Sequence, residues 1–155
     1  MARDQIKVKL SPTVSVVAPF IPTVRHRMFL SSLDISWITN NNIRYLFFYK
    51  TRGLEEFSTI VETLKGSLSS VLVDFYPFAG RLDIQAGDSS RPEVDCNDDG
   101  VKFVEASIDV TIQELEKDDF QHKRFFEQLA LMNESSYDAP LMTIQVSPLI
   151  ITTWF

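Results

Sequence analysis

Apolar residues recur at three- and four-residue spacing over residues 57–75, and this period places them along one side of an amphipathic helix. Gly66 lies inside that helix at a cost of about 1 kcal/mol relative to alanine, so we expect another element to pack closely against it. Pro77 lacks a backbone donor and should end the helix, and Gly80 should allow a sharp turn into a strand over 81–84. The predicted apolar stripe consists of Phe57, Ile60, Val61, Leu64, Leu68, Val71, Leu72 and Phe75.

Alternating or continuous apolar runs predict the strands. The run over 43–49 is aromatic and β-branched, which favours a strand with both faces covered. The turn Asn97-Asp98-Asp99-Gly100 separates two short strands and predicts a β-hairpin. The expected extended segments are 6–17 (an edge interrupted by Pro12), 43–49, 81–84, 93–96, 101–106 and most of 141–155.

Two shorter helices are predicted after the hairpin. Thr111 and Glu114 have capping-box spacing, which favours a short helix through Glu116, and a second helix is expected over 120–131. Loops or single turns are expected at 19–22, 29–37, 40–42, 87–92 and 135–140. Because helices and strands are interleaved, the fold class is mixed α/β or α+β, in one domain covering 1–155.

Composition and charge exclude several classes of partner. The chain of 155 residues is 45% hydrophobic and 23% charged, with a net charge of −6 and a pI of about 4.9. So acidic a chain is not expected to bind a nucleic acid or an anionic membrane surface. No stretch approaches the ~20 apolar residues of a membrane span. The single cysteine, Cys96, cannot form an intramolecular disulfide, and the N-terminus lacks the apolar core of a signal peptide. We therefore expect a soluble protein of the cytosol.

Individual reactive side chains give no sign of a catalytic or metal site. His26 lies in a proline-bounded loop and His122 in a charged run, so both are expected at the surface. Cys96 in its strand is expected to be inert packing, and two distant histidines with one cysteine have no metal-ligand spacing. We expect no bound cofactor.

The segment YPFAGR at residues 76–81, hereafter the signature segment, follows the long helix and resembles the N-terminal region of the BAHD family of plant acyl-CoA-dependent acyltransferases. Further similar segments occur in the family's order at 30–34, 46–49, 64–72, 94–106 and 141–146. The resemblance covers about 5–146, and the apolar residues 147–155 depart from it.

The resemblance implies part of the first domain of a chloramphenicol-acetyltransferase-like fold, a mixed sheet with flanking helices. It also implies transfer of an acyl group from acyl-CoA to a hydroxyl or amine of a plant metabolite, with a motif histidine as the general base. The family's His-x-x-x-Asp motif is expected after Val146, but the chain continues as SPLIITTWF and ends. Neither histidine fits this motif, since Leu30 is four residues after His26 and Phe126 is four after His122. The downstream Asp-Phe-Gly-Trp-Gly motif is also absent, so we expect a truncated and inactive chain.

The resemblance suggests roles for eight residues, none of them catalytic. The loop after Trp37 borders the acceptor pocket in the family, which makes Asn40, Asn41 and Arg44 the candidates for substrate binding. The candidates for a structural role are Asp34, Tyr76, Pro77, Gly80 and Arg81, with Asp34 as a turn cap.

Three functions remain open from the sequence. The first is the N-terminal part of an acyltransferase, whose partners are acyl-CoA and a small-molecule acceptor. The second is a non-catalytic module that pairs with a full-length relative or a complementary half through the exposed C-terminal edge. The third is a small-ligand carrier that uses the aromatic run at 43–49.

Overall fold

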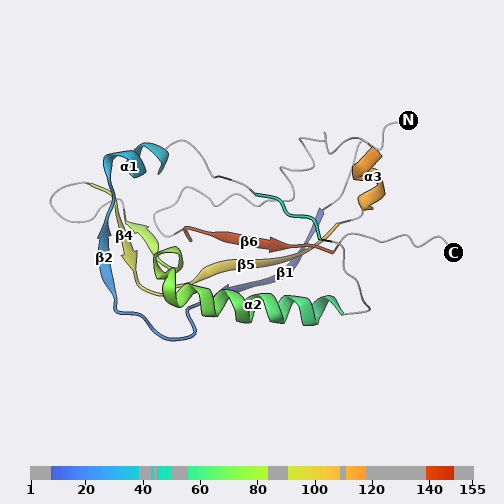
Figure 1. The fold of residues 1–155 in the computed structure, drawn as a ribbon, viewed down its shortest axis with the longest axis horizontal. Coiled ribbons are helices and arrows are strands. Elements are labelled where there is room, and N and C mark those ends of the chain that lie inside the picture. The colour runs from blue at the N-terminus through green and yellow to red at the C-terminus, as the bar shows by residue number, and fades with distance from the viewer. Residues whose placement is uncertain are drawn as a thin grey trace.

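The structure is a computed structural model that describes residues 8–38, 43, 45–49, 56–83, 91–108, 111–117 and 139–148. It contains helices, a short 3₁₀-helix and strands arranged in two sheets (Figure 1). In chain order the elements are β1 (Val8–Val17), β2 (His26–Phe29), α1 (Ser32–Ile38), α2 (Phe57–Asp74), η1 (Tyr76–Ala79), β3 (Arg81–Asp83), β4 (Glu93–Cys96), β5 (Val101–Ile108), α3 (Ile112–Lys117) and β6 (Thr143–Val146).

The first sheet, sheet A, is mixed and has the strand order β1-β5-β6. β1 pairs with β5 antiparallel, and β5 pairs with β6 parallel. The register of β1 shifts between Leu10 and Val14, a span that contains Pro12, because proline cannot donate to a strand ladder. The expected edge strand at the N-terminus and the expected mixed sheet are both present.

The second sheet, sheet B, is antiparallel and has the strand order β2-β4-β3. β4 is its central strand, with Val94 and Cys96 buried and Glu93 and Asp95 half-buried. Arg27 pairs with Asp95 across the ladder, so the two side chains lie on the same face of the sheet. That face is charged, whereas the face that carries Cys96 and Val94 also carries the imidazole of His26, which pairs with Cys96.

The main core lies between α2 and sheet A. Val61 and Leu72 of α2 are 2% and 1% exposed and pack with Val17, Val101 and Phe103 of the sheet. Phe57 and Leu68 of α2 are partly buried against this cluster. The long helix ends at Asp74, one residue before the end of the predicted apolar stripe.

The apolar stripe is broader than the face that this core covers. Leu64, Val71 and Phe75 belong to the stripe, yet their exposed fractions are 42%, 51% and 56%. Spacing identified the helix correctly but could not tell which part of a wide apolar face has a neighbour. Gly66 likewise lies in open space, with no atom within 4 Å of the position that a Cβ would take. The expectation of close packing at Gly66 is therefore wrong.

The predicted β-hairpin is also wrong. Both strands exist, but β4 belongs to sheet B and β5 to sheet A, so residues 97–100 connect two sheets. Asp98 and Gly100 have φ angles of 57° and 85°, which is the left-handed conformation that the Asn-Asp-Asp-Gly sequence favours. The turn chemistry was recognised, but it does not determine whether the flanking strands pair.

Three other expectations differ from the structure, two of them at or next to β2 and the third at residues 45–49. His26 begins β2, where a loop is expected from the sequence. The prediction misses this strand because it is short and is stabilised by pairing with β4, which is remote in sequence. The region at 29–37 forms helix α1, somewhat longer than the single turn expected. Residues 45–49 are not part of a strand. The expectation that both faces of this segment are covered is also wrong, because Tyr45, Phe47 and Tyr49 are exposed.

Some of the remaining expectations concern residues that the structure describes, and others concern residues outside them. The short helix after Thr111 is confirmed as α3. Of the strand expected over most of 141–155, the structure contains β6 at Thr143–Val146, whereas residues 141, 142, 147 and 148 are not in a strand. The predicted helix at 120–131 and the apolar end at 149–155 lie outside the described residues. Within the part of the chain that the structure describes, no helix is long and apolar enough to cross a membrane.

Candidate functional site

The signature segment forms the junction between the two sheets. After α2, η1 carries Tyr76 and Pro77, and Gly80 leads into β3 of sheet B. Phe75 donates its amide to the Val71 carbonyl and so closes the last turn of α2. Pro77 has no amide to donate, which suits the start of a short 3₁₀-helix. The sequence therefore turns the chain out of the helix and into the sheet within six residues.

Gly80 is required because backbone passes too close for any side chain. A Cβ at this position would lie 2.5 Å from the Asp95 carbonyl oxygen and 3.1 Å from the Pro77 carbonyl oxygen. The φ angle of Gly80 is −86°, which any residue adopts. The expected reason for this glycine, freedom to turn, is therefore not the one that the geometry supports.

Arg81 binds backbone carbonyls on the connection between the sheets. Its guanidinium donates to the carbonyls of Gly80 at 3.0 Å, Gly100 at 2.8 Å and Asp99 at 3.1 Å. The Gly100 amide in turn donates to the Ala79 carbonyl at 2.8 Å. The Arg81 side chain is only 14% exposed, and its bonds to the Gly80 and Gly100 carbonyls are partly buried, whereas the bond to Asp99 is exposed. Arg81 thus holds the 97–100 turn against the signature segment.

The same turn is held from the other side by a contact that the sequence did not indicate. The Asp98 carboxylate accepts hydrogen bonds from the Thr23 amide at 2.6 Å and the Thr23 hydroxyl at 2.7 Å. The only available signal was the Asn-Asp-Asp-Gly turn itself, which gives no information about a partner 75 residues away. The junction therefore joins the 18–25 loop, the signature segment and the start of β5.

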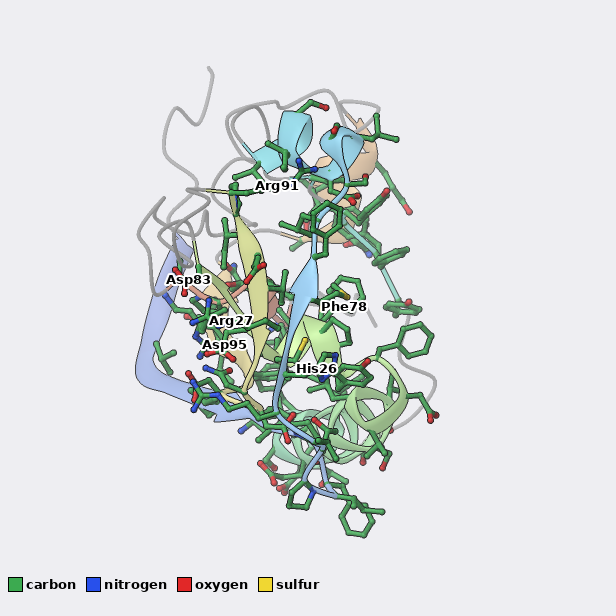
Figure 2. The ribbon with its side chains drawn as sticks, turned by 90° about the vertical axis from the view of Figure 1, so that its left-hand side faces the viewer. His26, Arg27, Phe78, Asp83, Arg91 and Asp95 are labelled. Carbon is green, nitrogen blue, oxygen red and sulfur yellow. The ribbon has the colours of Figure 1, made fainter. Side chains whose placement is uncertain are left out.

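Sheet B carries a chain of ion pairs on its outer face. Figure 2 shows Arg27, Asp83 and Asp95 on one side of the sheet, with His26 and Phe78 on the other. Arg25 donates to both oxygens of Asp95, at 3.2 and 2.6 Å, and this bonding lowers the pKa of Asp95. Arg27 lies 2.8 Å from Asp83, and the pKa of Arg27 is raised by that bond.

Tyr76 faces away from these charges and packs edge-on against His26. The two ring centroids are 5.3 Å apart at 62°, and the Tyr76 hydroxyl lies 3.5 Å from His26 Nε2. His26 Nδ1 lies 2.9 Å from the Val24 carbonyl, so Nδ1 donates to that oxygen. His26 is thus bonded to its own loop and to the signature segment.

Asp34 caps the first turn of α1. Its carboxylate accepts from the Ser31 amide at 2.9 Å and from the Ser31 hydroxyl at 2.6 Å, and the Asp34 amide donates back to that hydroxyl at 3.3 Å. These bonds lower the pKa of Asp34. Arg91, which sequence analysis missed, secures the same region: it donates to the Leu30 carbonyl at 3.0 Å and stacks 4.4 Å from the Phe29 ring.

The one cysteine of the chain and its acidic side chains would form a reactive or metal-binding site only in particular surroundings. Cys96 is fully buried in β4, and burial raises the pKa of its thiol, which keeps it protonated and unreactive. No cluster of three or more His, Cys, Asp or Glu able to hold a metal occurs within the described ranges. Asn40, Asn41 and Arg44, the candidates for substrate binding, lie outside the described residues. His122 lies outside them as well.

Comparison with known proteins shows the fold. The chain superposes on the crystal structure of vinorine synthase with a TM-score of 0.56 and 22% sequence identity, over 91% of this chain and 34% of that protein. The likeness confirms the expected mixed α/β class. Much of the vinorine synthase fold has no counterpart in this chain.

Sequence comparison identifies the family. The Transferase family model matches residues 7–150. The chain is 38% identical over 99 residues to benzyl alcohol O-benzoyltransferase of Petunia hybrida, which covers 64% of this chain and 21% of that protein. It is 35% identical over 139 residues to (Z)-3-hexen-1-ol acetyltransferase of Arabidopsis thaliana, covering 86% and 30%.

A third relative, 13-hydroxylupanine O-tigloyltransferase of Lupinus albus, is 33% identical over 146 residues, which is 92% of this chain and 32% of that protein. The chain therefore spans about a third or less of the length of the curated relatives that it matches. Since the family model covers most of the sequence and the matched relatives are plant acyltransferases, the chain belongs to the BAHD family of acyltransferases.

Proposed function

We propose that this chain supplies the N-terminal part of an enzyme that transfers an acyl group from acyl-CoA to a plant metabolite. The observation that carries the proposal is the match of the Transferase family over residues 7–150. The names of three relatives each specify an acyl group, namely benzoyl, acetyl and tigloyl, and all three name an acceptor that carries a hydroxyl. A hydroxyl acceptor is thus favoured over an amine. Acyl-CoA is the co-substrate, and no bound cofactor is needed.

The 155-residue chain by itself is not expected to catalyse this reaction. Its sequence contains no histidine followed four residues later by aspartate, and loss of a general base costs a factor of ~10²–10⁴ in rate. The larger loss comes from the missing remainder of the channel, because positioning of the two substrates supplies much of the rate enhancement. In the complete enzyme, Asn40, Asn41 and Arg44 border the acceptor, and Arg81 serves the scaffold.

The test has two arms. Purified chain is incubated with benzoyl-CoA or acetyl-CoA and with benzyl alcohol or (Z)-3-hexen-1-ol, and ester formation is followed by mass spectrometry. We expect no ester above the protein-free rate, and measurable transfer would reject the claim of inertness. In the second arm, residues 1–146 replace the corresponding part of the Arabidopsis acetyltransferase. We expect this fusion to form hexenyl acetate, and failure of the folded fusion would count against the proposed scaffold role.

A second candidate function is favoured by the exposed apolar side chains. Val71, Phe75 and Phe78 are 51%, 56% and 49% exposed, although they are large and lie in consecutive turns. A non-catalytic module that pairs with a full-length relative or a complementary half would cover such a surface. Size-exclusion chromatography of the chain with and without a full-length relative tests this function, and strictly monomeric behaviour in both samples would argue against it.

A further inference from the structure

The connection between the two sheets contains a chemically reactive pair of residues, Asp99 and Gly100. They form the only Asp-Gly or Asn-Gly pair in the sequence. In such a pair the backbone can attack the preceding side chain, because glycine has no side chain to shield its amide nitrogen. The Asp99 side chain is 51% exposed, so water reaches it. The pair takes no part in acyl transfer, and its reactivity therefore has to be explained separately.

The fold requires the glycine of this pair. Gly100 has a φ angle of 85°, and a Cβ there would lie 2.7 Å from both the Val17 carbonyl oxygen and Val16 Cγ1. A larger residue, which would slow the attack by shielding the amide, does not fit at this position. The reactivity of the pair must therefore be controlled by something other than the choice of residue.

Hydrogen bonds hold both reacting groups. The Gly100 amide, which is the nucleophile, donates to the Ala79 carbonyl at 2.8 Å. Arg81 donates to the carbonyls of Asp99 and Gly100 at 3.1 and 2.8 Å and so fixes the peptide groups on both sides of that amide. The Asp99 carboxylate accepts from the Asn97 side-chain amide at 2.7 Å. Because the attack removes the amide proton, the bond to Ala79 has to break before the reaction can begin.

We propose that Asp99–Gly100 is a site of spontaneous isoaspartate formation, and that Arg81 and the Ala79 carbonyl protect it in the folded chain. In the reaction the Gly100 nitrogen bonds to Asp99 Cγ, and the amide proton and the carboxyl hydroxyl leave as water. A water molecule then opens the resulting succinimide ring at one of its two carbonyls. The products are the original aspartate or an isoaspartyl link through Cγ, and both have the mass of the starting chain.

The isoaspartyl product does not match the geometry of the junction. It adds Asp99 Cβ to the backbone between β4 and β5, and the former main-chain carbonyl becomes a free carboxylate. Gly100 is buried against Val16 and Val17, so it has little room to take up the added length. The modified chain should therefore lose the bond between the Gly100 amide and Ala79. Isoaspartate at this position then marks chains whose junction has opened.

Ageing of the 155-residue chain at neutral pH tests the inference. Folded chain and chain unfolded in guanidinium chloride are incubated side by side. Isoaspartate is counted with an isoaspartyl methyltransferase and located by mass spectrometry with electron-transfer fragmentation. We expect it at Asp99 in the unfolded chain, and at least about tenfold slower formation in the folded chain. Asp99→Glu is the chemical control, because its longer side chain does not form the five-membered ring, and the signal should disappear.

Three variants test which contacts protect the site. Arg81→Met should form isoaspartate about tenfold or more faster than the natural folded chain. Thr23→Val is milder, because it removes only the hydroxyl bond to Asp98 at 2.7 Å on the same turn. We expect a rise of about two- to fivefold for it. Gly66→Ala changes α2 in open space away from the junction, so its rate should stay within about twofold of the natural chain.

Several results would overturn the inference. Equal rates in the folded and unfolded chains would mean that the hydrogen bonds give no protection. Natural rates in both Arg81→Met and Thr23→Val would mean that these contacts do not control the site, and Thr23→Val alone decides if Arg81→Met does not fold. A rate for Gly66→Ala that falls in proportion to its gain in stability would mean that the site opens only when the whole chain unfolds.

Discussion

At the scale of single residues, Gly80 shows how one missing side chain sets the geometry of the junction. We expect Gly80→Ala to destabilise the chain by about 1–3 kcal/mol, because its methyl group would overlap the Asp95 carbonyl, a backbone atom that cannot rotate away. Urea unfolding followed by circular dichroism measures the loss.

Gly66→Ala is the matched control for that substitution. Its added methyl group meets open space on the outside of α2, and alanine favours a helix over glycine by about 0.4–1 kcal/mol. The unfolding midpoint should therefore rise for Gly66→Ala and fall for Gly80→Ala. Equal shifts at the two positions would show that close approach of backbone is not the reason for Gly80.

Asp95 gives a prediction for the pH dependence of stability. Its bond to Arg25 lowers the pKa of Asp95 in the folded chain below the unfolded value of about 3.9. The pair therefore stabilises the fold above roughly pH 4, and this contribution is lost as the pH falls through the folded pKa. In urea titrations between pH 6 and pH 2, the difference in free energy of unfolding between the natural chain and Asp95→Asn should become smaller as the pH falls.

The partner variant Arg25→Gln provides the check on this assignment. It should show the same narrowing, because the pH dependence belongs to the pair and not to either residue alone. The effect should also weaken in 1 M salt, since the Arg25 side chain is 71% exposed. If the difference in free energy of unfolding between the natural chain and either variant stays constant with pH, the Asp95 carboxylate contributes only packing.

At the scale of elements, α2 shows that the helical spacing of apolar residues does not determine which of them are buried. Adjacent residues Val71 and Leu72 both belong to the apolar stripe, yet one is half exposed and the other is in the core. We expect Leu72→Ala to lower the free energy of unfolding by about 2–5 kcal/mol, and Val71→Ala to change it by less than about 1 kcal/mol. Thermal unfolding of the two variants tests this, and similar losses would place a neighbour over both positions.

The elements that sequence predicted are those whose cause is local. The α2 helix follows from apolar spacing, α3 from the residues after Thr111, and the 97–100 turn from residues that tolerate positive φ. The pairing of β4 with β2 could not be predicted, because it depends on partners about 70 residues away. For the same reason the binding of Thr23 by Asp98 left no sequence signal. The residues of the signature segment were identified, but their contacts were not.

At the scale of the whole molecule, Arg81 connects sheet A to sheet B. Its carbonyl contacts hold the 97–100 turn, which is the covalent link between β4 and β5. We expect Arg81→Met to cost about 2–3 kcal/mol and Arg81→Lys to recover little, because an ammonium cannot reach several carbonyls with a planar fork. Hydrogen exchange should speed up at the Gly100 amide in both variants, while amides in the middle of α2 change less.

The pairing of β1 with β5 has a consequence for how the chain is made. Val17 pairs with Val101 and Val8 with Ile108, so the partners are roughly 80–100 residues apart. A ribosome that adds ~5–20 residues per second needs on the order of 5–20 s to deliver the second strand. During that delay β1 leaves the exit tunnel with its partner still unsynthesised. The N-terminal strand therefore stays unpaired until residues 101–108 have been made, and slow codons placed before residue 101 would lengthen that interval.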